Sequence, residues 1–173
     1  DGSVSGGGGN DSVDGGLGAD TLSGGAGRDV ANYSARTVGV HVDFEGDADD
    51  GASGENDTVA TDIEDARGGD GADTLVGDGG ENKLESGPGV DNLNGAGGPD
   101  LLQAGDGADA VNGGGGDDAL DGGLGPDTLA GGDGHDTVDY SARTVSVQAD
   151  LDGVANDGQE SENDSIAPDV ESL

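Results

Sequence analysis

A repeat of nine residues governs most of this chain. From Gly68 to Asp139 the sequence divides into eight consecutive nonapeptides without an insertion, and three more run from Gly6 to Asn32. All eleven units have Gly at the fourth position, and ten have Val or Leu at the eighth. A period kept in phase over so many units predicts an architecture of stacked, equivalent coils.

The sixth position of the repeat carries an acidic side chain in ten units and an amide in one. These residues are Asp11, Asp20, Asp29, Asp73, Asn82, Asp91, Asp100, Asp109, Asp118, Asp127 and Asp136. A column of carboxylates in phase with a column of aliphatic residues is not expected of a random acidic sequence. The sequence therefore predicts that the carboxylates share one structural role.

The conformation of one unit follows from its residue types. Its glycines allow positive φ, so the first six residues can form a tight turn. The last three residues are long enough for a short strand, in which the eighth side chain points to one face and its neighbours to the other. Two units can then form one coil with both aliphatic side chains inside. We therefore predict an all-β parallel β-roll, or β-solenoid, with two nonapeptides per coil.

Composition adds a condition to this fold. The net charge is -34, 40 residues are Gly, and fewer than a fifth are Val, Leu, Ile or Phe, which is typical of disordered chains. We expect bound cations to offset the repulsion between carboxylates.

The composition also excludes several kinds of function. The chain has only five Lys and Arg residues, which argues against binding to nucleic acid or to an anionic membrane. It has no apolar run that predicts membrane insertion, and its lack of Cys excludes disulfides and thiolate metal sites.

The repeat GGxGxDxUx resembles the calcium-binding nonapeptide of repeats-in-toxin (RTX) proteins, also called haemolysin-type calcium-binding repeat proteins. The resemblance implies a right-handed roll with Ca²⁺ between turns that come from repeats two apart. It pairs Asp73 with Asp91, Asp91 with Asp109, Asp109 with Asp127, Asn82 with Asp100, Asp100 with Asp118, Asp118 with Asp136, and Asp11 with Asp29. These pairs imply about seven or more ions. Asp20 is expected to pair with a turn in the segment after it.

Backbone carbonyls of the adjoining turns are expected to complete each site. The candidates are Gly7, Gly9, Gly69, Gly71, Gly87, Gly89, Gly105, Gly107, Gly114, Gly116, Gly123 and Gly125. Six to eight oxygen ligands in flexible geometry suit Ca²⁺, whereas Mg²⁺ requires a stricter octahedron, and zinc or copper would need softer ligands. The Asn82 site should be the weakest of its block, because an amide lacks the carboxylate charge.

Two segments interrupt the nines and match each other. Residues 33–66 and 140–173 align without a gap, and both open with YSARTV and contain END. The predicted organisation is a first roll block over 1–32 with repeats over 6–32, an insert over 33–67, a second block over 68–139, and a second insert over 140–173. We expect the inserts to continue the solenoid as wider coils and the natural chain to resume its repeats after Leu173.

Alternating residues in the inserts predict a longer strand in each, formed by Val38, Val40, Val42 and Phe44 and by Val145, Val147, Ala149 and Leu151. Further calcium ligands are predicted at Asp43, Asp57 and Asp62 and at their counterparts Asp150, Asp164 and Asp169. The alternative for these six residues is a solvated acidic loop.

The sequence favours a non-catalytic structural module. His41 and His135 belong to no repeated constellation, and the Gly-rich runs lack the features of a phosphate loop. The RTX resemblance implies a secreted bacterial protein, extracellular or on the cell surface, that folds on Ca²⁺ binding and acts as a monomeric spacer, export-folding device or adhesin segment beside neighbouring domains of the same chain. Two alternatives are a module appended to a secreted hydrolase or polysaccharide-modifying enzyme, and a solenoid face that binds ice or glycan.

Overall fold

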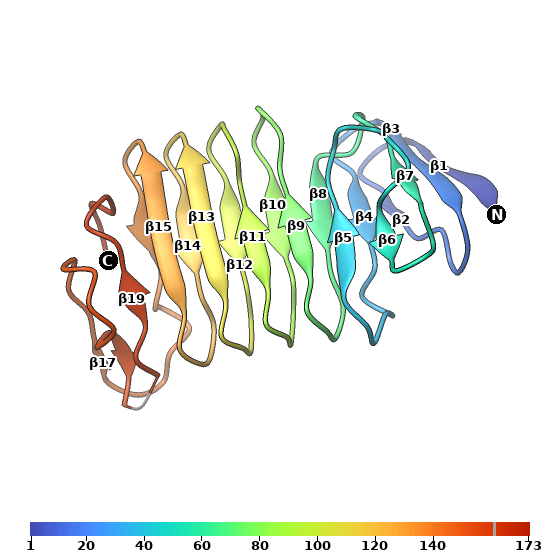
Figure 1. Ribbon diagram of the computed structural model, residues 1–173. Coiled ribbons are helices and arrows are strands. Elements are labelled where there is room, and N and C mark those ends of the chain that lie inside the picture. Colours follow the sequence, from blue (N-terminus) through green and yellow to red (C-terminus); the bar gives the residue numbers. More distant parts are fainter. Residues whose placement is uncertain (161) are drawn as a thin grey trace.

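The computed structural model describes residues 1–160 and 162–173, and every regular element in this part of the chain is a β-strand. Figure 1 shows an elongated stack of coils with the two termini at opposite ends. The strands on each side run parallel from one coil to the next. The predicted parallel β-solenoid is therefore confirmed.

Two seven-stranded sheets form the long sides. In spatial order, the first contains β16 (Thr137–Val138), β14 (Ala119–Asp121), β12 (Leu101–Gln103), β10 (Lys83–Glu85), β8 (Asp65–Arg67), β4 (Val30–Asn32) and β2 (Ser12–Val13). The second contains β19 (Ser165–Ile166), β15 (Thr128–Asp133), β13 (Ala110–Gly115), β11 (Asn92–Asn94), β9 (Thr74–Val76), β5 (Val40–Val42) and β6 (Gly51–Ala52). Two smaller sheets join β1 (Gly2–Gly8), β3 (Asp20–Ala26) and β7 (Thr58–Val59), and β17 (Val147–Gln148) and β18 (Gly158–Gln159).

The register of the strands confirms two nonapeptides per coil. Leu84 lies opposite Leu102, and Leu93 lies opposite Val111, so each residue pairs with the equivalent residue two repeats away. Eighth-position side chains of alternate repeats consequently enter opposite sheets and meet inside. All ten of the predicted Val and Leu residues at this position are at most 2% exposed. The core is a narrow ladder with one large side chain per repeat.

The fourth position of every repeat, and the second position of nine of the eleven, is Gly because successive coils touch there. A Cβ added to Gly87, Gly105 or Gly125 would lie under 3.0 Å from the carbonyl oxygen of the residue eighteen positions earlier. The carbonyls of the turns therefore stack directly beneath the next glycine. A side chain at Gly87, Gly105 or Gly125 would therefore push two coils apart.

Ala96 breaks this glycine pattern at a second position. Its φ is 72°, a left-handed conformation that costs an L-residue with a Cβ about 1–2 kcal/mol. Ala96→Gly is therefore expected to raise the melting temperature of the calcium-loaded chain by about 2–4 °C. Ala119→Gly is the matched control, since Ala119 lies in strand β14 and has no positive φ, and we expect it to lower the melting temperature. Differential scanning calorimetry decides; a decrease for both variants would contradict the prediction.

The first insert continues the solenoid, but its strands are placed in reverse order. β5 pairs with β9, which follows the insert, whereas the later strand β7 pairs with β3, which precedes it. The antiparallel hairpin β5–β6 carries the chain back between them. The second insert repeats this arrangement in part, with β19 beside β15 and the antiparallel pair β17–β18.

The predicted longer strands are much shorter in the structure. Val40, Val42 and Phe44 are buried as the alternation implies, but strand β5 covers only Val40–Val42 and Val38 is 58% exposed. The strand ends where the backbone N–H of Asp43 donates to the Asp50 carboxylate instead of to a neighbouring strand. In the second insert β17 has two residues, and Val145 is 57% exposed.

Candidate metal sites

The sixth-position side chains form two ladders along opposite edges of the stack. In each ladder the backbone N–H of one residue donates to Oδ1 of the residue eighteen positions later, at 2.7–2.9 Å. The structure brings together all seven predicted pairs: Asp11–Asp29, Asp73–Asp91, Asp91–Asp109, Asp109–Asp127, Asn82–Asp100, Asp100–Asp118 and Asp118–Asp136. In each pair, one oxygen of the later residue's carboxylate thus bonds to the preceding coil and fixes the distance between the two coils.

In most of these residues, the other carboxylate oxygen has no hydrogen-bond partner in the part of the chain that the structure describes. Oδ2 is buried without a hydrogen-bond donor in nine of the eleven predicted residues, which are Asp11, Asp20, Asp29, Asp91, Asp100, Asp109, Asp118, Asp127 and Asp136. A buried anionic oxygen without a partner carries a large free-energy cost. Nine such atoms in register indicate that a ligand from outside the chain supplies the missing positive charge.

The surroundings of these oxygens suit a hard cation. A Cβ built on Gly6 would lie 2.7 Å from Asp11 Oδ2 and 2.8 Å from the Gly24 carbonyl oxygen. The first glycine of the unit therefore leaves open a hollow that a carboxylate and a carbonyl from the next coil both face. Oxygen donors of these two kinds are those that Ca²⁺ prefers, so the residues present fit the metal.

The predicted carbonyls lie at the same edges. Among the twelve candidates, the oxygens of Gly7, Gly9, Gly69, Gly71, Gly87, Gly89, Gly105, Gly107, Gly114 and Gly116 lie under 3.0 Å from the Cβ that would be built on the glycine of the next coil. Gly123 differs, because its oxygen accepts a hydrogen bond from Arg143. Ten of these carbonyls thus face the next coil, where the Gly105 oxygen already accepts the Leu124 N–H at 2.7 Å. Calcium binding by the twelve carbonyls, Gly125 included, stays a prediction.

Burial raises the pKa of the ladder carboxyl groups. The pKa of Asp91 rises to about 6, and those of Asp100 and Asp127 rise to about 7, mainly through desolvation and further through neighbouring carboxylates. Backbone hydrogen bonds to the charged form oppose these increases. The pKa values of Asp73, Asp109 and Asp118 also rise for the same main reason.

These shifts predict that acid stabilises the metal-free fold. A carboxyl whose pKa is higher in the folded state binds protons that the unfolded chain releases, so its favourable effect is present near pH 5 and is lost as pH rises through about 6–7. We expect circular dichroism in EDTA to report more β-structure at about pH 5 than at pH 8. Calcium affinity should fall as the pH is lowered from about 8 to about 5, because Ca²⁺ must then displace protons from the carboxyl groups. An unchanged spectrum and affinity would contradict the prediction.

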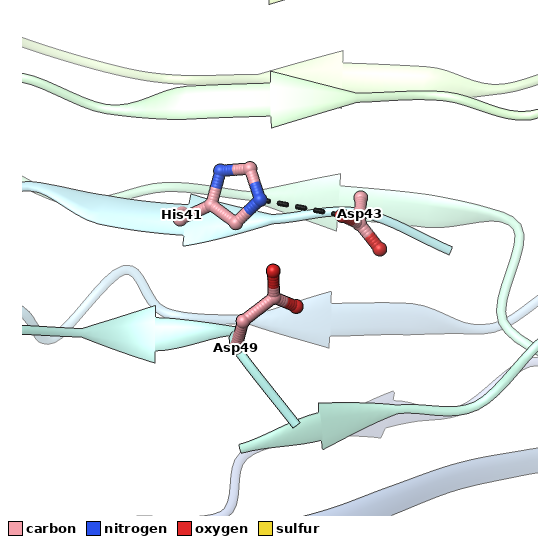
Figure 2. Close-up of side chains that lie close together, drawn as sticks. All are labelled: His41, Asp43 and Asp49. Carbon is pink, nitrogen blue, oxygen red and sulfur yellow. Dashed lines mark hydrogen bonds and ion pairs between the residues drawn. The ribbon is translucent and has the colours of Figure 1, made fainter. Parts of the chain in front are cut away.

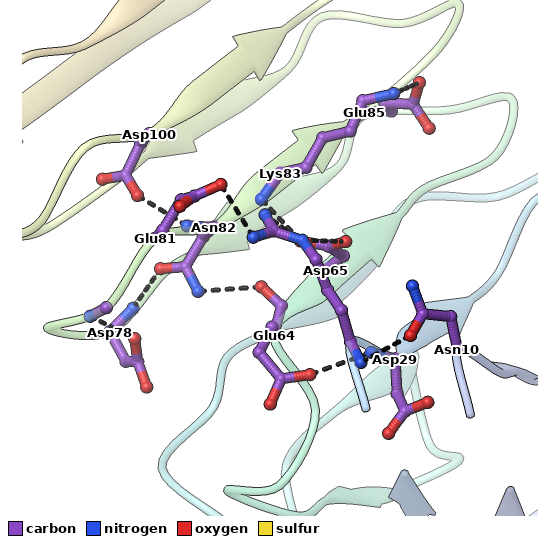
Figure 3. A network of polar contacts seen from close by, with 12 residues as sticks. Asn10, Asp29, Glu64, Asp65, Asp78, Glu81, Asn82, Lys83, Glu85 and Asp100 are labelled. Carbon is purple, nitrogen blue, oxygen red and sulfur yellow. Dashed lines mark hydrogen bonds and ion pairs between the residues drawn. The ribbon is translucent and has the colours of Figure 1, made fainter. Parts of the chain in front are cut away.

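Two predicted residues have an occupied second atom. Asp73 Oδ2 accepts a hydrogen bond from the Gly69 N–H at 2.9 Å. The Asn82 side-chain N–H donates to the Glu64 carbonyl at 2.8 Å, and Asn82 Oδ1 accepts from the Asp78 N–H at 2.9 Å (Figure 3). The Asn82 side-chain amide therefore contacts the Glu64 carbonyl oxygen, which an ion at this position would otherwise contact. This is a different role from the weak calcium ligand that the sequence predicted at this position.

Asn82→Asp is expected to have opposite effects with and without calcium. Without calcium, the new carboxylate would face the Glu64 carbonyl with no donor between them, which should destabilise the fold. With calcium, the variant should bind one more ion and gain about 2.7 kcal/mol at a concentration 100-fold above the Kd of that site. Isothermal titration calorimetry gives the ion count. Asn92→Asp makes the same substitution at an exposed position and should change neither quantity.

The inserts extend both ladders. Asp20 N–H donates to Asp57 Oδ1 at 2.8 Å, and Asp127 N–H donates to Asp164 Oδ1 at 3.0 Å, so two of the six insert candidates take ladder positions. Asp20 thus meets the following segment as predicted. On the opposite edge, Asp29 and Asp136 donate to carboxylates that the sequence interpretation did not include, those of Glu64 and Glu171.

A signal for Glu64 was present in the sequence. Counting back nine residues from Gly68 gives the unit 59–67, in which Glu64 holds the sixth position and the buried Ala66 holds the eighth. The unit was hidden because its turn has no glycine. Glu171 occupies the equivalent place in the second insert.

The remaining insert candidates bind backbone groups. Asp62 accepts hydrogen bonds from Gly24 N–H, Gly25 N–H and the Ser23 hydroxyl, and Asp169 accepts from Gly131 N–H. Asp43 and Asp150 accept from the N–H groups of Glu45 and Asp152. Each of these carboxylates stabilises a turn within or beside its insert.

A separate polar cluster lies on the first insert. His41 Nε2 is 3.2 Å from Asp43 Oδ2, and Asp49 approaches the pair from the following loop (Figure 2). Its side chains are wholly or partly exposed, and Gln148, Asp150 and Asn156 stand at the equivalent positions of the second insert. The cluster is therefore not part of the repeated design.

Comparison with known proteins agrees with the geometry. The family model for the RTX calcium-binding nonapeptide repeat (4 copies) matches residues 1–31, 60–93, 67–102, 85–120, 94–129 and 112–142, which together span about two thirds of the chain. No curated protein matches the sequence. The described residues contain no helix that could span a bilayer. The repeats, the stacked turns and the family match together place this chain in the family of RTX calcium-binding nonapeptide repeat proteins.

Proposed function

We propose that this chain is a calcium-dependent structural rod of a secreted bacterial protein, in which it acts as a spacer and does not catalyse a reaction. The observation that carries the proposal is the register of nine buried carboxylate oxygens without donors. Such a stack requires several cations before it can be stable. A need for several ions makes folding sensitive to calcium concentration.

The calcium requirement suggests where folding takes place. Calcium is scarce in the cytosol and millimolar outside the cell, so an acidic chain of this kind can remain unfolded during export and fold afterwards. The five cationic side chains cannot neutralise 39 carboxylates by themselves. External calcium then acts both as the folding signal and as the source of positive charge.

The shape supports the spacer role. The coils stack along one axis, and the termini emerge at opposite ends of the stack (Figure 1). Domains joined to the two ends would be held apart at a constant distance. Outward seventh-position side chains vary from repeat to repeat, including Lys83, Asn92 and Ala110, so they do not form the regular face expected of an ice-binding or glycan-binding surface.

Small-angle X-ray scattering on the complete chain tests the proposal. With calcium, we expect the dimensions and mass of a monomeric rod, and with EDTA we expect the larger radius of gyration of an expanded chain. Dyes attached at the two termini should report a narrow distance distribution only in calcium. A compact particle of the same dimensions in both conditions would refute a calcium-dependent rod.

A further inference from the structure

Both inserts place a buried arginine at the point where the regular stack stops. The Arg36 and Arg143 side chains are each only 8% exposed. Arg36 donates to the Gly16 carbonyl oxygen, and Arg143 donates to the Gly123 carbonyl oxygen. Gly16 and Gly123 hold the second position of the last unit before the insert on that edge of the stack.

The second-position carbonyl has a different neighbour elsewhere in the stack. Within the uninterrupted repeats it faces the next coil, as the Gly105 oxygen lies against Gly123 and accepts a hydrogen bond from the Leu124 N–H at 2.7 Å. At the junctions no nonapeptide occurs eighteen residues later, because the inserts begin at Tyr33 and Tyr140. The guanidinium group fills the space that this missing turn leaves over the carbonyl.

Acidic side chains surround each guanidinium. Arg36 Nε lies 3.2 Å from Glu55 Oε2, and Arg36 Nη1 lies 3.9 Å from Asp14 Oδ1. In the second copy, Arg143 lies 3.8 Å from both Glu162 Oε2 and Asp121 Oδ1. Carbonyl and carboxylate oxygens around one position are donors of the two kinds that a calcium ion takes. Here the positive charge is covalently attached to the chain.

In each insert, a tyrosine hydroxyl also donates a hydrogen bond to a ladder carboxylate. The Tyr33 hydroxyl donates to Asp57 Oδ2 at 3.0 Å, and the Tyr140 hydroxyl donates to Asp164 Oδ2 at 2.8 Å. This second oxygen is the atom that lacks a donor in the regular ladder. The arginines also stack on these tyrosines, with the guanidinium carbon 5.6 Å from the ring centre in each copy. At both junctions the glycine carbonyl and the second oxygen of the insert carboxylate therefore have protein donors, whereas Asp20 Oδ2 and Asp127 Oδ2 keep none.

We propose that Arg36 and Arg143, each assisted by its tyrosine, act as built-in cations that take the place of Ca²⁺ where the roll meets an insert. The inference rests on the proposed calcium-dependent rod. It means that the junctions need one ion fewer than continuous repeats would. The inserts then hold their ends of the stack at calcium concentrations where the regular ladders are still incompletely filled.

Arg36→Ala and Arg143→Ala test this directly. Each variant should bind one more Ca²⁺ than the unaltered chain, and its folding midpoint should move to a several-fold higher calcium concentration. Isothermal titration calorimetry gives the ion count. Terbium luminescence excited through tyrosine gives the location, because the chain has two Tyr and no Trp, so an ion entering a vacated cage lies beside one of the two sensitisers.

Two further variants serve as controls. Arg67→Ala removes the same charge from a guanidinium that is 46% exposed and pairs with Glu85, and it should leave the ion count unchanged. Arg36→Lys keeps the positive charge and should keep the original count. An unchanged or lower count in both arginine-to-alanine variants, or their failure to fold at saturating calcium, would overturn the inference. If the unaltered chain binds no calcium, the proposed function itself fails.

Discussion

Chelation of calcium at about pH 8 is expected to unfold the entire chain. The net charge is -34, and the apolar core is a ladder with one large side chain per repeat. Nine buried carboxylate oxygens would then have neither a hydrogen-bond donor nor a cation. A core this thin cannot offset repulsion of that size, so we expect a disordered chain once the metal is removed.

The expected effect exceeds that of any single substitution. A site held at a calcium concentration 100-fold above its Kd contributes about 2.7 kcal/mol, so a few filled sites match the roughly 5–15 kcal/mol stability of an ordinary domain. Circular dichroism during a calcium titration from EDTA should show one cooperative transition from coil to β-structure. Magnesium at the same concentration is the control and should not restore the fold. A calcium-free chain with the full β-signal at pH 8 would refute the prediction.

Asp109→Asn is expected to weaken calcium binding strongly, as is the same substitution at any ladder residue that belongs to two pairs. Asp109 Oδ1 accepts a hydrogen bond from Asp91 N–H at 2.8 Å, and Asp109 N–H donates to Asp127 Oδ1 at 2.9 Å, so the residue belongs to two adjacent pairs. An amide keeps the oxygen that joins the coils but places an N–H₂ group where the second carboxylate oxygen faces the metal. Both adjoining ions should be weakened or lost.

The loss should be measurable in ion count and in folding midpoint. We expect about two fewer ions and at least a tenfold higher calcium concentration at the midpoint, since each 1.4 kcal/mol corresponds to about a factor of ten. Asp106→Asn is the matched control, because Asp106 lies in the same turn, carries the same charge and is exposed. If the two variants behave alike, the ladder carboxylates act only through net charge and the assignment of Asp109 as a ligand is wrong.

The regular part of the fold could be predicted from the sequence because it depends on local chemistry repeated at a constant interval. Glycine at the turn positions, Asp at the sixth position and Val or Leu at the eighth repeat identically, so one unit determines the contacts of the next. The buried ladder from Leu75 to Val138 follows from this period, and the seven pairs follow from the RTX resemblance, which stacks repeats two apart. The family match has the same origin, since it covers the repeats and leaves out most of the two inserts.

The order of strands in the inserts could not be predicted in the same way. Alternating Val40, Val42 and Phe44 indicate a strand but carry no information on which neighbour it pairs with. That choice depends on Asp50, whose carboxylate accepts the N–H groups of both Asp43 and Val59 and so turns the chain back on itself. Such contacts join residues at irregular separations, and no periodic pattern marks them in the sequence.

What the sequence determined by itself is therefore the solenoid, its two-repeat coil, the acidic ladders and the affinity for calcium that the family shares. Only the tertiary structure placed Glu64 and Glu171 in the ladders, gave Asn82 a partner at the Glu64 carbonyl and set Arg36 and Arg143 over the last carbonyls of the stack. The physical reason is the range of the contacts. Repeated contacts are specified by a unit of nine residues, whereas the inserts are held by unique buried charges that meet only after the chain has folded.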